Sequence, residues 1–180
     1  MKILYTYIIN PRKAFTFYGK ETPYNASWLA LFFASWTAAL FSIPESIFEF
    51  ITLTLLFSIL NIFFIFIYSL IVDFFSQFIS KTTGKSLKLF HWFSLSLLPF
   101  CIFIPVRSFS ITMPIFDTIY SMIYTLTFFI VILLQIYTVR KLYRLSLVKS
   151  AILFASPFIL FASMLLLLLF FSGLFFIQSF

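Results

Sequence analysis

Few side chains in this chain of 180 residues could take part in chemistry. The chain has one histidine, His91, and one cysteine, Cys101. A nucleophile needs a base beside it, and a metal centre needs several nitrogen, sulfur or carboxylate ligands at suitable spacing. Glu45 and Glu49 lie four residues apart, but two carboxylates are too few for a cation site. We therefore expect no enzyme activity, no metal centre and no cofactor.

A first group of polar residues surrounds a short basic segment. Asp73 precedes this segment and His91 follows it, with Lys81, Lys85 and Lys88 between them. One interpretation is a single polar cluster at the mouth of a helical hairpin. The alternative is an interfacial aspartate that pairs with a loop lysine, together with a histidine that reaches toward lipid headgroups.

A second group lies within strongly apolar stretches. Asn61 and Gln135 carry amides that either join two helices by hydrogen bonds or contact a substrate. Pro99 and Pro157 interrupt the helical hydrogen-bond ladder, which is typical of packed kinks and also of the broken helices of transporters. Convergence of these four residues on one cavity would favour transport.

Composition indicates an integral membrane protein. Hydrophobic residues make up 63% of the chain, charged residues 9%, and the mean hydropathy is +1.13. The net charge is +7, but the basic residues lie in short loops rather than along one continuous face. Anionic lipid headgroups therefore fit these residues better than nucleic acid does.

Five apolar runs are long enough to span a bilayer as helices, because lipid leaves backbone amides no other partners. We predict an all-α polytopic fold, with one domain over residues 1–180. The third run is the shortest and contains His91 and Pro99. The predicted spans are residues 23–43, 50–72, 89–106, 118–139 and 150–177.

Basic residues predict the orientation of these spans. They form three clusters, whereas the segments between the clusters hold Glu45, Glu49, Asp117 and one basic residue, Arg107. Lysine and arginine in short loops mark the cytoplasmic side, so we expect a cytoplasmic N-terminus, an external loop over residues 107–113 and an external C-terminus. The clusters are Lys2, Arg12, Lys13 and Lys20; Lys81, Lys85 and Lys88; and Arg140, Lys141, Arg144 and Lys149.

The segment before the first span is predicted to be a short interfacial helix over residues 10–20. Asn10 is a good helix cap and Pro11 a favoured first residue. A solvated linker is the alternative. Within the first span, small residues recur at a spacing of four, which predicts close packing against another helix or, alternatively, a path lined by small residues. This small-residue stripe comprises Ala26, Ala30, Ala34, Ala38 and Ser42.

Three short motifs occur in order along the chain. They are Asn10-Pro11-Arg12-Lys13-Ala14-Phe15, then Thr83-Gly84-Lys85-Ser86 with its following helix, then the basic segment 140–149 leading to Ala151 and Pro157. Together with five predicted spans, they resemble the Yip domain family of membrane proteins, whose eukaryotic members act in vesicle traffic. The chain has neither the long N-terminal region nor the Asp-Leu-Tyr-Gly-Pro-like motif of those members. The resemblance therefore implies a compact, prokaryotic-type protein of the cytoplasmic membrane.

These patterns lead to two functional hypotheses. The first is a noncatalytic scaffold or adaptor whose basic cytoplasmic loops contact anionic lipid or a partner protein. The second is a small transporter, or a transporter subunit, with a midplane site at the two interrupted helices.

Overall fold

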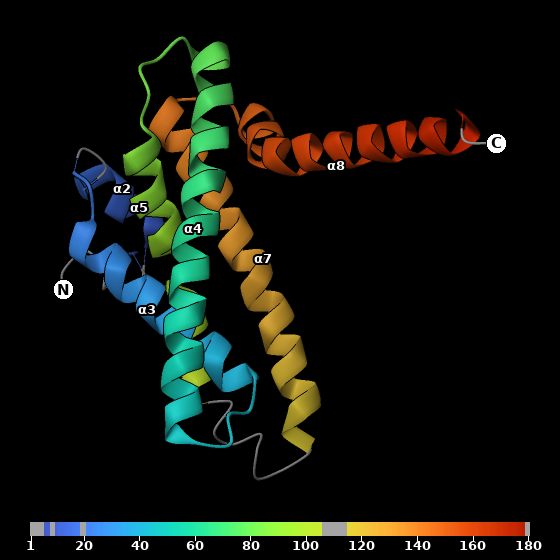
Figure 1. Cartoon of the computed structure of the whole chain (residues 1–180). Helices are drawn as coiled ribbons and strands as arrows, with labels where there is room; N and C mark the ends of the chain where they lie inside the picture. Colours follow the sequence, from blue (N-terminus) through green and yellow to red (C-terminus); the bar gives the residue numbers. More distant parts are fainter. Residues whose placement is uncertain (1–5, 8–9, 19–20, 106–114, 179–180) are drawn as a thin grey trace.

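The computed structural model of the chain describes residues 6–7, 10–18, 21–105 and 115–178 (Figure 1). The regular elements in these ranges are all helical, which confirms the predicted all-α class. They are α2 (Pro11–Tyr18), α3 (Tyr24–Phe41), α4 (Ile47–Ser80), α5 (Ser86–Ser96), the 3₁₀ helix η1 (Leu98–Ile102), α7 (Ile115–Tyr143) and α8 (Leu147–Gln178). Lys2, Lys20 and the predicted external loop with Arg107 lie outside the described residues.

Four segments are long and apolar enough to cross a membrane, so the protein is an integral membrane protein. The 18-residue helix α3, which corresponds to the first predicted span, is not among them. The predicted number of five spans therefore stays a prediction. The four segments are Ile47–Ser80, Ser86–Pro105, Ile119–Tyr143 and Leu147–Phe170.

Helix α4 extends well beyond the predicted span of residues 50–72. Its start is capped by Ser46, whose hydroxyl accepts the backbone N–H of Glu49 at 3.1 Å. Its last residue is Ser80, and the following residue, Lys81, has a left-handed φ of 51°, which is common after helices. At 1.5 Å per residue its 34 residues cover about 50 Å, more than the roughly 30 Å hydrocarbon core.

The third predicted span forms the interior of the bundle. Residues 89–96 of α5 are all buried, and 56% of an apolar stretch of 18 residues within Ser86–Pro105 is buried, against 11% of the corresponding stretch of α4. At Pro99 the α-helix has already given way to η1, because proline supplies no N–H to continue the ladder. The segment that looked weakest as a span is therefore the one on which the other helices pack.

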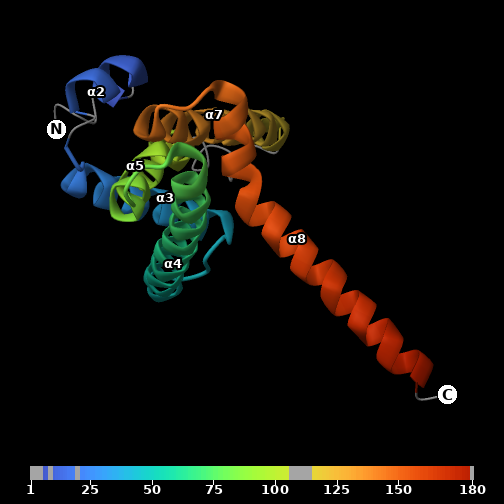
Figure 2. The same cartoon turned by 90° about the horizontal axis from the view of Figure 1, so that it is seen from above.

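The helices are arranged so that the basic segments meet (Figures 1 and 2). The last turns of α4 and α7 and the first turns of α5 and α8 lie at the same end of the bundle, which we call the basic end. Helix α2 lies beside α5, where Phe15 stacks on Trp92 at 4.0 Å. Helix α8 leaves the bundle crosswise to α4 and α7, and its residues 158–170 are all exposed.

The small-residue stripe of α3 has two different environments. Ala26 and Ala30 are buried in a cluster with Trp92 and Leu95 of α5, as close helix packing requires. Farther along α3, Ala34, Ala38 and Ser42 line a cavity. One part of the stripe therefore packs against α5, and the other part faces an open space.

This division makes the two halves distinguishable by substitution. We expect Ala30→Leu to destabilise the fold by about 1–3 kcal/mol, because its added methyl groups have no space against α5. Ala38→Leu is the matched control, since it points its larger side chain into a cavity. Thermal unfolding of both variants in the same detergent tests this, and equal midpoints would contradict the packing account.

Candidate functional site

A buried carboxylate holds the basic end together. Asp73 of α4 is 4% exposed and accepts three hydrogen bonds. Its Oδ1 accepts the backbone N–H of Lys85 at 2.9 Å and the hydroxyl of Tyr143, and its Oδ2 accepts the Gln77 amide at 3.0 Å. These donors come from the α4–α5 loop, the end of α7 and the next turn of α4. One side chain therefore fixes the relative positions of two helices and a loop.

Lys85 reinforces the same junction with its side chain. Its Nζ donates to the carbonyl oxygen of Leu142 at 3.0 Å and lies 5.6 Å from the ring centre of Tyr143. The bonded carbonyl belongs to the last turn of α7, where a cation also interacts favourably with the helix dipole. Asp73 is thus joined to Lys85 through the lysine backbone, while the ammonium group binds α7.

Gly84 allows the loop to approach this carboxylate closely. A Cβ atom at this position would lie 3.0 Å from Nε2 of Gln77 and 3.1 Å from Oδ2 of Asp73. Both distances are too short for an ordinary carbon contact. The lack of space beside the buried carboxylate therefore explains why glycine occupies this position of the loop.

The turn from α7 to α8 leaves the basic side chains of residues 140–149 exposed. Arg144 has a left-handed φ of 55°, and the N–H of Leu145 reaches back to the carbonyl oxygen of Arg140 at 3.1 Å. This is the hydrogen bond of a Schellman helix end. Of the predicted contact residues, Lys85 and Lys88 are partly buried, and the exposed ones are Arg12, Lys13, Lys81, Arg140, Lys141, Arg144 and Lys149.

His91 does not join the Asp73 cluster and does not reach outward. It is 3% exposed, and its Nδ1 lies 2.6 Å from the hydroxyl of Ser27 in α3. Because the Ser27 hydroxyl donates to the carbonyl oxygen of Tyr24 at 2.7 Å, the imidazole donates its Nδ1 proton to Ser27. The rings of Tyr24 and Trp28 cover the imidazole edge-on. This histidine therefore joins α5 to α3.

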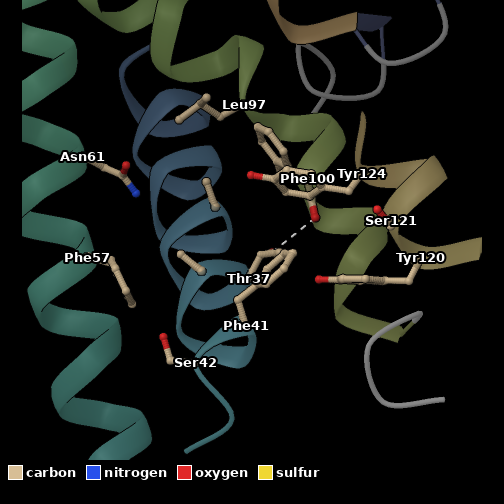
Figure 3. A pocket seen from close by; sticks show the side chains of 12 residues that line it. Thr37, Phe41, Ser42, Phe57, Asn61, Leu97, Phe100, Tyr120, Ser121 and Tyr124 are labelled. Carbon is tan, nitrogen blue, oxygen red and sulfur yellow. Dashed lines mark hydrogen bonds between the residues drawn. The ribbon is translucent and has the colours of Figure 1, made fainter. Parts of the chain in front are cut away.

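A cavity of about 500 Å³ lies between α3, α4, η1 and α7 (Figure 3). Asn61 borders it from α4 and donates from Nδ2 to the Ser35 hydroxyl at 3.1 Å. The single proton of the Thr37 hydroxyl is shared between the carbonyl oxygen of Phe33 in α3, at 2.9 Å, and that of Phe100 in η1, at 3.2 Å. The amide of Asn61 therefore joins two helices and also faces an open space.

Gln135 borders a second cavity of about 410 Å³, next to the first. Leu97, Phe100 and Tyr124 line both cavities, so the two cavities adjoin at these residues. Pro99 lines a third cavity of about 370 Å³ on the side of Tyr7 and Leu134. The two amides and the two prolines therefore do not converge on one site.

The carbonyl groups at Pro157 already have hydrogen-bond donors. Pro157 cannot donate to the carbonyl oxygen of Leu153, which instead accepts the hydroxyl of Ser156 at 2.7 Å. The neighbouring carbonyl of Phe154 accepts the hydroxyl of Tyr68 from α4. The predicted interruption at Pro157 is not observed, because α8 continues through this residue. The hydrogen bonds beside it provide a contact with α4 rather than carbonyl oxygens for an ion.

Several residues of these sites were not singled out from the sequence. Gln77 could have been predicted, because it lies four residues after Asp73 and so on the same face of α4. Tyr143, Ser27 and Tyr68 carry no such signal, since each partner is distant in sequence. Within the described residues, no group of three histidine, cysteine, aspartate or glutamate side chains could hold a metal ion.

Comparisons with known proteins do not identify a family for this chain. No family model matches it, and no curated protein and no solved structure matches it either. The functional argument therefore depends on the sites themselves.

The Asp73 junction predicts a difference between two tyrosines of α7. Tyr143→Phe removes a hydrogen bond to a buried carboxylate, and we expect a loss of about 1.5–3 kcal/mol in stability. Tyr137→Phe is the control, because the Tyr137 hydroxyl has no hydrogen-bond partner among the described residues. Thermal or denaturant unfolding in detergent measures the stability of both variants. Equal effects of the two substitutions would show that the junction is not a main contributor to stability.

Proposed function

We propose that this protein is a noncatalytic membrane scaffold or adaptor whose basic end contacts anionic lipid headgroups or a partner protein on the cytoplasmic side. The observation that carries the proposal is the meeting of two basic segments, distant in sequence, at one end of the bundle (Figure 1). Glu45 and Glu49 lie at the other end of α4. This separation of charge matches the preference of lysine and arginine for the cytoplasmic side.

The construction of the basic end also supports this role. Asp73, Gly84 and Lys85 hold the α4–α5 loop against the end of α7, so the exposed basic side chains project from a fixed backbone. A fixed arrangement lowers the entropy that is lost when a surface binds. Each exposed lysine or arginine near an anionic surface contributes on the order of 1 kcal/mol.

Transport at the two interrupted helices has less support. Such a site requires polar groups that converge and carbonyl oxygens without donors. Asn61 and Gln135 border different cavities, and the carbonyl oxygen freed by Pro157 accepts Ser156. We therefore keep the scaffold as the proposed function.

The topology that we propose has five spans, a cytoplasmic N-terminus and an external C-terminus. The order of the three motifs supports membership in the Yip domain family as a compact, prokaryotic-type protein of the cytoplasmic membrane. One basic segment lies at the start of α5 and the other at the end of α7. Because both lie at the same end of the bundle, they support the orientation.

Cysteine labelling in intact cells tests this orientation. In a Cys101→Ser background, we expect Glu45→Cys to react with a membrane-impermeant maleimide from outside. Lys81→Cys and Lys149→Cys should react only after the membrane is opened, because both lie at the basic end. The background without an added cysteine is the control, and external labelling of either lysine position would overturn the orientation.

Lipid selectivity tests the proposed role of the basic end. We expect the triple variant Lys81→Gln, Lys141→Gln, Lys149→Gln to lose roughly tenfold or more in preference for phosphatidylglycerol over phosphatidylcholine, since three charges are removed. Quenching of tryptophan fluorescence by brominated lipids in vesicles measures the preference.

The matched control replaces the same three lysines by arginine and so keeps the charge. It should retain the preference of the unchanged protein. If the glutamine variant also retains it, lipid contact at the basic end is refuted, and proteins that co-purify with the unchanged chain but not with the glutamine variant would point to the adaptor role.

A further inference from the structure

The two cavities adjoin at shared lining residues, and the proposed scaffold function uses neither of them. We refer to the two adjoining cavities together as the crevice. The first, about 500 Å³, is lined by α3, α4, η1 and α7, and the second, about 410 Å³, by α4, α5, α7 and α8. Leu97, Phe100 and Tyr124 lie at their boundary. Each volume falls within the range of small-molecule sites.

The floor and the rim of this crevice differ in exposure. Thr37, Phe93 and Val131 on its floor are 3%, 1% and 4% exposed. Phe64, Phe128 and Phe158 on its rim are 64%, 49% and 64% exposed. These exposed rings belong to segments that are long and apolar enough to cross a membrane. We therefore expect the crevice to open sideways toward lipid tails rather than toward water.

Among the side chains that the structure describes, no aspartate, glutamate, lysine, arginine or histidine lines either cavity. A charged headgroup placed inside would lose its hydration without gaining a counter-charge, which is costly. The occupant of the crevice must therefore be uncharged where it lies within the protein.

Polar groups are present but unequally distributed. The first cavity is lined by Ser42, Asn61 and Ser121, whose hydroxyl and amide groups can both donate and accept hydrogen bonds (Figure 3). The second cavity is lined mainly by aromatic and aliphatic side chains, among them Phe93 and Phe154, and Gln135 is its one amide side chain among the described lining residues. A molecule with one uncharged polar end and one long apolar chain fits this distribution.

We propose that the crevice binds an uncharged single-chain amphiphile, such as a monoacylglycerol. Its hydroxyl or ester end lies at Ser42, Asn61 and Ser121, and its acyl chain passes Tyr124 to lie among the phenylalanines. The basic end plays no part in this site, so the two proposals succeed or fail separately.

Photolabelling tests the site on the full chain in phosphatidylcholine nanodiscs. The probe is a monoacylglycerol with a diazirine in its 16-carbon chain, and the labelled peptides are mapped by mass spectrometry. We expect label on α4, α5 and α7 at residues that line the second cavity. Unlabelled monopalmitoylglycerol should reduce this label, whereas phosphatidylglycerol should not.

A filled cavity provides the critical comparison. Ala38→Phe places a ring in the first cavity, and we expect labelling of the crevice to fall about tenfold, which corresponds to a loss of about 1.4 kcal/mol. Ala162→Phe makes the same change at an exposed position of α8 and should leave the label unchanged. Unfolding midpoints and elution volumes of both variants establish that each is folded.

A third variant remains informative if Ala38→Phe does not fold. Ser121→Ala removes one hydroxyl from the polar end and should weaken competition by monopalmitoylglycerol without weakening competition by hexadecane. The proposal is overturned if label spreads evenly over the exposed faces of α4, α7 and α8, or if no folded crevice variant changes it.

Discussion

The buried carboxylate of Asp73 is the interaction on which the arrangement of the helices depends. A charge removed from water is stable only when hydrogen-bond donors replace its hydration, so the backbone N–H of Lys85, the Gln77 amide and the Tyr143 hydroxyl must all be in place. Two of these donors lie outside α4. Burial of Asp73 therefore requires the α4–α5 loop and the end of α7 to meet, and the basic side chains on both segments come together as a consequence.

The need for hydrogen bonds to backbone carbonyl groups constrains the rest of the bundle in the same way. In hydrocarbon an unpaired carbonyl is expensive, so each interruption of a helix needs a local donor. Ser156 and Tyr68 supply donors next to Pro157, and Thr37 donates to the carbonyl oxygen of Phe100 in η1. Some polar residues inside the bundle therefore join helices, whereas others, such as Ser94, bond a carbonyl of their own helix. Among the described side chains, those that line the two cavities carry no formal charge.

The basic end and the crevice consequently have different chemistry. The basic end combines exposed cations with a backbone that Asp73 and Lys85 fix in place. The crevice combines uncharged hydroxyl and amide groups with aromatic walls.

Sequence patterns were sufficient for the features that depend on local chemistry. Apolar runs predicted the helices, and Asn10 was predicted as a helix cap, whose Oδ1 accepts the backbone N–H of Lys13 at 3.0 Å. The small-residue stripe predicted the close packing of Ala26 and Ala30. Tertiary structure alone decided which distant residues meet: His91 with Ser27, Asp73 with Tyr143, and the division of the stripe between packing and cavity. It also decided that the weakly apolar third segment lies at the centre of the bundle. The physical reason is that hydropathy and periodicity report only what one segment prefers, whereas a buried polar group is stabilised by whichever donor the fold brings within about 3 Å.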